Sequence, residues 1–325
     1  MKFKEKDIRP KKIFNEFLHL ASLDIKKYFG KAKNKINCVA CNEKGRFSFK
    51  KMNFSYCECK KCNTLFVSPR PHEKAFLNYY TTSPSIKFLA THLYKKTEKV
   101  RKNKIIKPKA KIIFDFLKKN RKTNYTCVDI GGGYGIFAKE ISRLLKRKSL
   151  VIEPSPNLAN VCKKKGLIVI QKFLEEVKKK DLPLTKKIFT CFELFEHLHN
   201  PSKFIKNLKK IMQKGDLFFF TTLSSTGIDI LTLWENSRSI NPPHHLNFFN
   251  PRSIEIFLKK NNFKILNIST PGKIDINILK NDQKFIKDRF WKNFIVNSNE
   301  VEKNKMQNFI SSMNFSSHLM VVCQK

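Results

Sequence analysis

Short apolar runs alternate with amphipathic stretches from residue 127 onward. The runs lie at 127–130, 150–152, 187–193 and 217–220, and apolar residues recur with helical spacing over 204–212. Runs of this length are typical of buried strands, and strands that alternate with amphipathic helices form a parallel sheet with helices on its faces. The pattern therefore predicts an α/β fold.

Two further regions flank this pattern. Apolar residues over 13–28 have helical spacing and end before Gly30, which predicts a helix that packs on the protein or, alternatively, docks on a partner or membrane surface. The stretch 276–318 precedes a last apolar run at 319–323 and is too long for a tight link between two strands. We expect it to hold inserted helices near the substrate, with a plain surface excursion as the alternative.

The run at 127–130 leads into a glycine-rich turn, with the sequence Cys-Val-Asp-Ile-Gly-Gly-Gly-Tyr-Gly over 127–135. Glycines let a ligand approach the backbone, and the free N–H groups of the helix start that follows favour negative charge. Asp129 suits a cofactor with a cationic head, and Glu153, at the end of the next run, suits the hydroxyls of a ribose. The pattern predicts a site for a nucleotide-like cofactor; a glycine turn that binds nothing is the alternative.

A second motif follows the run at 187–193. The sequence Leu-Phe-Glu-His-Leu-His-Asn-Pro over 194–201 matches an "EHL-x-x-P" segment, and together with the glycine turn and its two acids it resembles the class I S-adenosylmethionine-dependent methyltransferases. The resemblance implies a Rossmann-like, seven-stranded, mostly parallel sheet and S-adenosylmethionine as the cofactor. Asp216 stands where that family usually has a second glycine. The residues that the resemblance assigns to the cofactor are Asp129, Gly131, Gly133, Glu153 and Phe192.

Five of the nine cysteines fall between residues 38 and 62. Two C-x-x-C pairs, Cys38 with Cys41 and Cys59 with Cys62, are separated by a spacing typical of a structural zinc site. Four thiolates leave no open position on the metal, so we expect this zinc to take no part in the reaction. Cys57 is a fifth candidate that would replace Cys59. A disulfide pair or unpaired thiols are the alternatives.

A small zinc ribbon ahead of such a core resembles sugar methyltransferases of surface-polysaccharide and deoxysugar pathways, and this resemblance covers nearly the whole chain. It implies a small or carbohydrate acceptor, such as a nucleotide-sugar or a glycan. The expected organisation is an N-terminal helix in 1–35, a zinc ribbon in 36–72, a helical connecting region in 73–122, and a methyltransferase core in 123–325 with an insertion at 276–318.

The net charge of +40 raises the question of a nucleic-acid partner. Few of the 66 basic residues are arginines, and the lysines are spread along the chain, whereas nucleic-acid sites favour arginine and concentrate charge on one face. AT-rich codons are a competing explanation for the lysine content. Under either explanation we expect attraction to anionic substrates.

Two other functions are weighed against this one. A zinc-ribbon RNA or DNA methyltransferase would use the basic surface, but residues 191–194 lack the Pro-Pro-aromatic motif of base-amino methylation, and the similar Asn241-Pro242-Pro243-His244 follows the fifth strand. A non-catalytic scaffold that only binds the cofactor is the second alternative. The intact acids and glycines favour an enzyme.

A base is needed to deprotonate a sugar hydroxyl or a carbon beside a keto group, and imidazole is suited to that role at neutral pH. His197 follows the fourth strand and His244 and His245 follow the fifth, at the edge of a parallel sheet where ligands bind. Methyl transfer is an in-line displacement, so the enzyme mainly aligns the acceptor. We predict that one of them is catalytic, in the order His244, His197, His245.

The location of the protein is predicted from its apolar segments. The chain has no 18-residue apolar stretch, and its first residues lack the apolar core of a signal peptide. These features predict a soluble, cytoplasmic protein.

Overall fold

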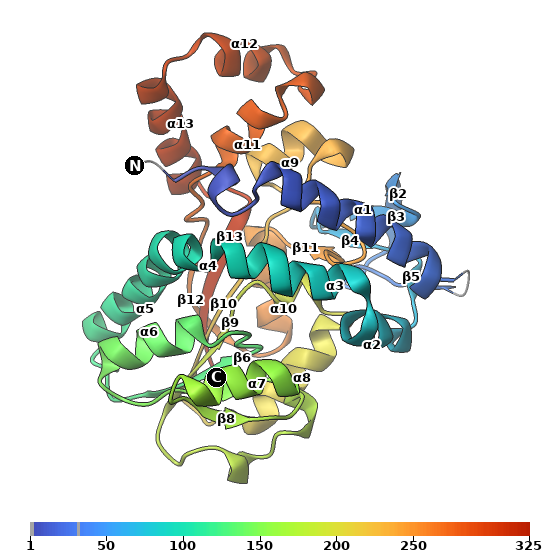
Figure 1. Cartoon of the computed structure of the whole chain (residues 1–325). Helices are drawn as coiled ribbons and strands as arrows, with labels where there is room; N and C mark the ends of the chain where they lie inside the picture. Colours follow the sequence, from blue (N-terminus) through green and yellow to red (C-terminus); the bar gives the residue numbers. More distant parts are fainter. Residues whose placement is uncertain (1–2, 31–32) are drawn as a thin grey trace.

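A seven-stranded sheet forms the centre of the protein, for which the computed structural model describes residues 3–30 and 33–325 (Figure 1). The strand order is β12-β13-β10-β9-β6-β7-β8; β13 runs antiparallel to β12 and β10 on either side of it, and the other neighbouring pairs are parallel. The strands are β6 (Thr126–Ile130), β7 (Leu150–Ile152), β8 (Ile168–Ile170), β9 (Lys187–Cys191), β10 (Leu217–Leu223), β12 (Lys264–Ser269) and β13 (His318–Gln324). The predicted Rossmann-like fold class is confirmed.

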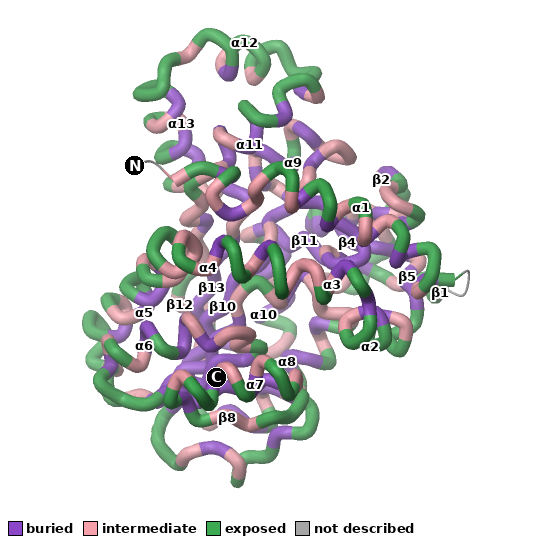
Figure 2. Tube along the Cα trace, viewed as in Figure 1, coloured by how far each residue is buried: buried purple, intermediate pink, exposed green. Residues whose placement is uncertain are grey.

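Helices cover both faces of the sheet, because alternate residues of its strands are apolar on both sides (Figure 2). Phe218 and Phe220 pack with helices α8 (Pro201–Ile211) and α10 (Pro251–Lys260). On the other face, Phe219 packs with α5 (Lys107–Lys119) and α6 (Ile136–Leu145). Helix α7 (Pro156–Lys164) lies near β7 and β8. The core is therefore fixed on both sides of the strands that carry the glycine turn.

The cysteine-containing region forms a four-stranded antiparallel sheet that includes a strand from the core. It consists of β2 (Gly45–Lys51), β3 (Phe54–Cys59), β4 (Leu65–Val67) and β11 (Asn247–Phe248), and a two-stranded pair, β1 (Lys33–Asn34) with β5 (Arg70–Pro71), lies beside it. The fully buried Arg70 donates hydrogen bonds to the His199 and Leu246 carbonyls and to Asn247 Oδ1. The sequence did not predict this shared strand, which joins the ribbon firmly to the core.

The N-terminal helix α1 (Lys11–Tyr28) lies against the helical connecting region. That region contains α2 (Glu73–Thr82), α3 (Pro84–Phe88) and α4 (Lys95–Arg101), and π-helical turns at Leu89–Tyr94 and Lys102–Ile106 link α3 to α4 and α4 to α5. Phe14, Phe17 and Ala21 of α1 pack with Leu93. None of the helices that the structure describes is long and apolar enough to cross a bilayer.

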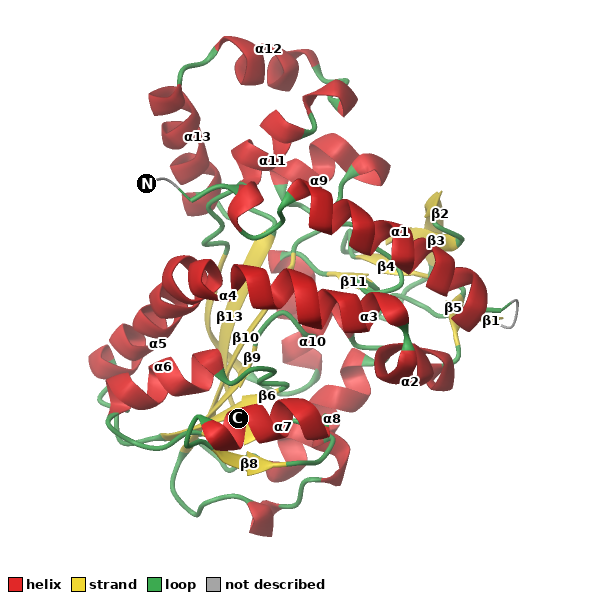
Figure 3. Cartoon of the chain, viewed as in Figure 1, coloured by secondary structure: helices red, strands yellow, loops and turns green. Residues whose placement is uncertain are grey.

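The stretch ahead of β13 forms a small helical group beyond one end of the sheet (Figure 3). It consists of α11 (Asp275–Asn281), α12 (Arg289–Asn297) and α13 (Glu300–Ser312), and α9 (Ile228–Leu233) packs with them. Leu233, Leu279, Ile295 and Ile310 form its own apolar cluster. The helical insertion before the last strand is thus present, as predicted from the chain length there.

Candidate active site

The glycine turn connects β6 to α6 and leaves one side of the backbone open. Gly131, Gly133 and Gly135 have φ values of +65°, +54° and +66°, a left-handed conformation that favours glycine. A Cβ atom at Gly135 would come within 2.6 Å of the Leu167 side chain, whereas one at Gly133 would meet nothing within 4 Å. Gly133 therefore presents its backbone to open space, as a site for a close-fitting ligand requires.

Two acids lie beside this turn in different environments. Asp129 is buried, and its Oδ1 accepts a 2.6 Å hydrogen bond from the Thr190 hydroxyl. Burial raises the pKa of Asp129 to about 7, against the opposing effect of that hydrogen bond. The Glu153 carboxylate accepts hydrogen bonds from the backbone N–H groups of Gly133 and Ser155, both at 3.0 Å. Glu153 thus stabilises the backbone of the glycine turn.

A cavity of about 550 Å³ lies above the turn and extends away from the sheet. Asp129, Gly131, Gly133 and Phe192 line it, and Glu153 is absent from its described lining. The opposite wall comes from the N-terminal segment, the connecting region and the insertion. Residues of that wall include Ile8, Arg9, Arg101, Lys273, Asp275 and His318. Segments far apart in sequence therefore close one end of the cavity.

Phe192 lines the cavity and packs against two of its other lining residues. Its ring lies edge-on to Phe137 with centroids 4.7 Å apart, and the Lys109 Nζ lies 4.5 Å from its centroid. Both neighbours also line the cavity. This packing fixes the orientation of an aromatic side chain directly after β9.

A carboxylate and an imidazole face each other within the cavity. The Glu193 Oε1 lies 3.2 Å from the Lys109 Nζ and 3.9 Å from the His318 Nδ1, and it accepts a hydrogen bond from the Thr221 hydroxyl. Partial burial raises the pKa of Glu193, but the charge of Lys109, and that of His318 when it is protonated, outweigh this effect, so that the pKa of Glu193 lies below its usual value. Burial lowers the pKa of His318, which Glu193 partly offsets. At pH 7 the pair therefore consists of an ionised carboxylate and a neutral imidazole.

The sequence reasoning missed His318, although a signal for it was present. Because β13 runs antiparallel to β10, its first residue, His318, pairs with the last residue of β10, Leu223. It therefore lies at the same edge of the sheet as the carboxyl ends of the parallel strands, where ligands bind. A histidine that begins the last strand of this fold is a recognisable candidate for a site residue.

The three predicted histidines lie together, but outside the described cavity lining. The ring centroid of His197 is 5.0 Å from that of His245 and 6.1 Å from that of His244. His244 is buried, and its Nε2 is 2.9 Å from the Tyr79 hydroxyl. Burial lowers the pKa of His197 to about 4 and that of His245 to about 3. Their catalytic role stays a prediction, and it would require an acceptor that reaches beyond the cavity.

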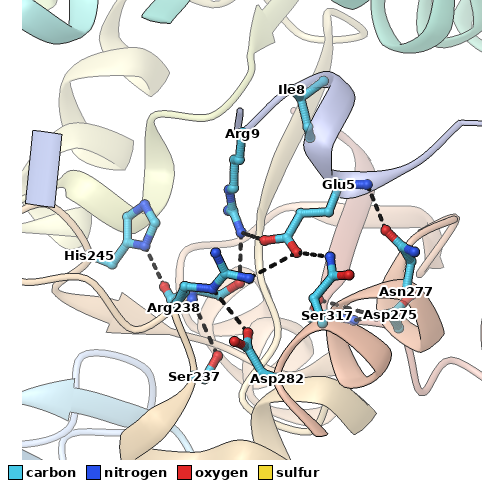
Figure 4. A network of polar contacts seen from close by, with 12 residues as sticks. Glu5, Ile8, Arg9, Ser237, Arg238, His245, Asp275, Asn277, Asp282 and Ser317 are labelled. Atoms are coloured by element: carbon cyan, nitrogen blue, oxygen red, sulfur yellow. Dashed lines mark hydrogen bonds and ion pairs between the residues drawn. The ribbon is translucent and has the colours of Figure 1, made fainter. Parts of the chain in front are cut away.

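An ion-pair network joins the N-terminal segment, which contributes Ile8 and Arg9 to the cavity lining, to the segments that carry Arg238 and Asp282 (Figure 4). The Glu5 carboxylate lies 3.2 Å from Arg238 Nη2 and 3.5 Å from Arg9 Nη1, and it accepts a hydrogen bond from Asn281 Nδ2. Arg238 also pairs with Asp282 at 3.0 Å. These contacts hold Arg9 at the cavity wall, a placement that no local sequence pattern indicates.

The four predicted zinc ligands converge in the ribbon. Their Sγ atoms all lie within 4.8 Å of one another, with Cys38 to Cys62 at 3.6 Å and Cys41 to Cys59 at 3.4 Å. Zinc bound tetrahedrally at about 2.3 Å from each sulfur requires separations of about 3.8 Å. The arrangement therefore fits a closed structural zinc site. The Cys57 thiol, the fifth candidate, lies outside this group and donates a hydrogen bond to the Ser68 carbonyl.

Comparisons with known proteins agree with this architecture. The family model described as "Methyltransferase domain" matches residues 101–268, more than half of the chain, and the chain belongs to this family. It is 29% identical over 113 residues to a ubiquinone biosynthesis O-methyltransferase of Colwellia psychrerythraea, which is 33% of this chain and 46% of the relative. The mitochondrial ubiquinone biosynthesis O-methyltransferase of Dictyostelium discoideum is 23% identical over 210 residues, which is 56% of this chain and 59% of the relative. The chain thus spans about half the length of these curated relatives.

Solved structures were also matched. The plantazolicin methyltransferase BpumL, in complex with SAH, has 13% identity and a TM-score of 0.48, with 77% of this chain and 94% of that chain covered. A SAM-dependent methyltransferase of Archaeoglobus fulgidus has 15% identity and a TM-score of 0.43, with 66% and 94% covered. The family match confirms the prediction of a methyltransferase.

Proposed function

We propose that this methyltransferase acts on a hydroxyl group of a small anionic acceptor, such as a nucleotide-linked or lipid-linked sugar. The observation that carries this proposal is the single cavity that joins the glycine turn and Asp129 to the His318–Glu193 pair and to Arg9. A methyl donor and an acceptor need to meet in one enclosed space, next to a group that accepts a proton.

The end of the cavity at the glycine turn would hold S-adenosylmethionine, whose sulfonium would supply the methyl group, with a neutral thioether as the leaving group. The Asp129 carboxylate binds the cationic end of this cofactor, and the backbone at Gly131 and Gly133 accommodates it closely. Glu153 receives the ribose hydroxyls in exchange for one of its present backbone hydrogen bonds. Phe192 lies along the cavity wall and limits how the cofactor is oriented.

His318 is the proton acceptor in this proposal. Its Nδ1 faces Glu193 at 3.9 Å, so that the carboxylate favours a proton on Nδ1 and leaves the Nε2 lone pair for the acceptor hydroxyl. As the acceptor oxygen takes the methyl group from the sulfonium, His318 Nε2 would accept the hydroxyl proton. Glu193 then stabilises the imidazolium, as a carboxylate does next to a protonated histidine.

The far wall of the cavity supports an anionic acceptor. Arg9 and Arg101 both line it, and Arg101 is oriented by a stacking contact with Tyr94 at 4.8 Å and a hydrogen bond to Thr97. Guanidinium groups bind phosphate and carboxylate oxygens well because they present several donors in a plane. The names of the two O-methyltransferase relatives support oxygen as the atom that receives the methyl group.

Two linked experiments test the proposal. Calorimetric titration of the zinc-loaded protein with S-adenosylhomocysteine should give micromolar affinity, and Asp129→Ala should abolish it. Transfer of a labelled methyl group should then be screened over nucleotide-sugars, phenols and RNA. Labelling of an anionic small molecule supports the proposal, whereas labelling of RNA with a steep dependence on salt would replace it with the nucleic-acid alternative.

A further inference from the structure

We propose a second metal site, separate from the ribbon, in which Glu196, His197 and His245 bind a divalent transition-metal ion. One ligand atom from each residue lies within 4.8 Å of the other two, and the His197 Nε2 is 4.0 Å from the Glu196 Oε1. Glu196 is buried, and the two histidines are partly buried. Two imidazoles and a carboxylate are a donor set that suits zinc, iron or cobalt.

Both imidazoles have their free nitrogen available to a metal. The His197 Nδ1 is 2.9 Å from the His244 carbonyl, and the His245 Nδ1 is 2.6 Å from the Ser239 carbonyl. A backbone carbonyl accepts a hydrogen bond, so each Nδ1 carries the proton and each Nε2 carries a lone pair. Metal-binding histidines are typically oriented in this way, through a hydrogen bond from the nitrogen that does not bind the metal.

A buried polar atom in the same place has no partner. The Glu196 Oε2 makes no hydrogen bond with any described group, and Glu196 is only 2% exposed. The nearby Tyr80 hydroxyl, on a ring edge-on to His197 at 6.5 Å, is also buried without a hydrogen bond. Burial raises the pKa of the Glu196 carboxyl to about 8, so a bound cation would displace its proton and satisfy the buried oxygen. The Nε2 atoms of His197 and His245 carry lone pairs, so they do not donate a hydrogen bond to Glu196.

A bound metal would draw the three ligand atoms together. Ligand atoms at 2.0–2.1 Å from a tetrahedral metal lie about 3.3 Å apart, compared with the 4.0 Å between Glu196 and His197 and an upper limit of 4.8 Å for the other two separations. Changes in the side-chain torsions would bring the ligand atoms to this spacing. The metal would join the segment after β9 to the segment after β10, next to Glu193 and Ser239, which both line the cavity.

Metal analysis of the full-length protein tests this proposal without any measure of methyl transfer. The protein is purified with zinc in the ribbon, dialysed against Co²⁺ at micromolar concentration, and its bound metals are counted by mass spectrometry. We expect two metal ions per chain in the unsubstituted protein and one in Glu196→Gln and His245→Gln. Cobalt at the second site should lack the thiolate charge-transfer bands that cobalt in the ribbon would show.

The matched control is His244→Gln, because the His244 ring is in the same cluster but its Nε2 already contacts Tyr79. This variant should keep two metal ions. Glu196→Gln preserves the shape of the side chain, so it tests the site even where His245→Gln fails to fold. One metal ion in the unsubstituted protein, or two in Glu196→Gln, would overturn the proposal.

Discussion

The two ends of the cavity are built in different ways. The cofactor end comes from short stretches at the carboxyl ends of neighbouring strands, such as Asp129 and Gly131 after β6 and Phe192 after β9. The far wall brings together Arg9, Arg101 and His318, which come from three distant parts of the chain. The first end is a motif that any member of the fold can share, while the second depends on how this chain places its N-terminal segment and insertion. We therefore expect substitutions to separate cofactor binding from acceptor chemistry.

The largest effect is expected at His318. In His318→Gln the acceptor hydroxyl loses its base, and turnover should fall by roughly 10²- to 10⁴-fold. Affinity for S-adenosylhomocysteine should stay the same, because the residue lies on the acceptor side. Initial rates with the acceptor found in the screen, together with calorimetry, measure both quantities.

Two companion variants sharpen this prediction. His19→Gln, at an exposed position of α1, controls for loss of a histidine in general. His244→Gln tests the base predicted from sequence. If His244→Gln loses turnover while His318→Gln keeps it, the base lies in the histidine cluster and the assignment of His318 is wrong.

Substitution of Asp129, in contrast to that of His318, should weaken binding of the cofactor. Asp129→Asn removes the charge that binds the cationic end of the cofactor, and affinity for S-adenosylhomocysteine should fall about 10- to 100-fold. Asp115→Asn, on the exposed face of α5 where the carboxylate pairs with Lys111, is the matched control. Equal affinity in the two variants would show that Asp129 does not contact the ligand.

A smaller effect is expected at the far wall. Arg9→Gln should raise the KM for the anionic acceptor about tenfold and change kcat little, because a guanidinium contact with an anion acts in the ground state and the transition state alike. Arg46→Gln, which removes an exposed partner of Glu58 in the ribbon, is the control. An unchanged KM in Arg9→Gln would mean that the acceptor binds elsewhere.

The smallest effect concerns pH. The base must be neutral, so kcat/KM should rise with pH through the pKa of His318 and level off above it; burial places this pKa below 6.5. Because Glu193 raises that pKa, Glu193→Gln should move the limb to lower pH. A profile of kcat/KM against pH for both proteins checks this shift. A limb that moves to higher pH would contradict the pairing of the two residues.

The difference between the two ends of the cavity also explains which features could be predicted from the sequence. The sheet, the glycine turn and the zinc ribbon follow from periodicity and spacing within short stretches. The type of enzyme was predicted from the resemblance of these motifs to a known family. The two acids predicted to bind the cofactor differ in their contacts: Asp129 lines the cavity, whereas Glu153 accepts a hydrogen bond from the backbone of the turn. Whether a carboxylate faces a ligand or the backbone depends on a few side-chain torsions, which spacing does not determine.

Long-range contacts account for what the sequence did not predict. The addition of β11 to the ribbon, the Glu5–Arg238 ion pair and the position of His318 each join segments that lie far apart in the chain. Conversely, His197, His244 and His245 were predicted together and do lie together. They are absent from the described cavity lining because other elements form the wall of the cavity, and the sequence around the histidines does not show this.

A crystal structure of the protein with S-adenosylhomocysteine tests the central claim most directly, because it needs no knowledge of the acceptor. The account predicts that the amino acid end of the ligand lies at Asp129 and that its sulfur faces the cavity toward His318 and Glu193. A ligand whose sulfur instead opens toward His197, His244 and His245, with His318 on its far side, would contradict the account.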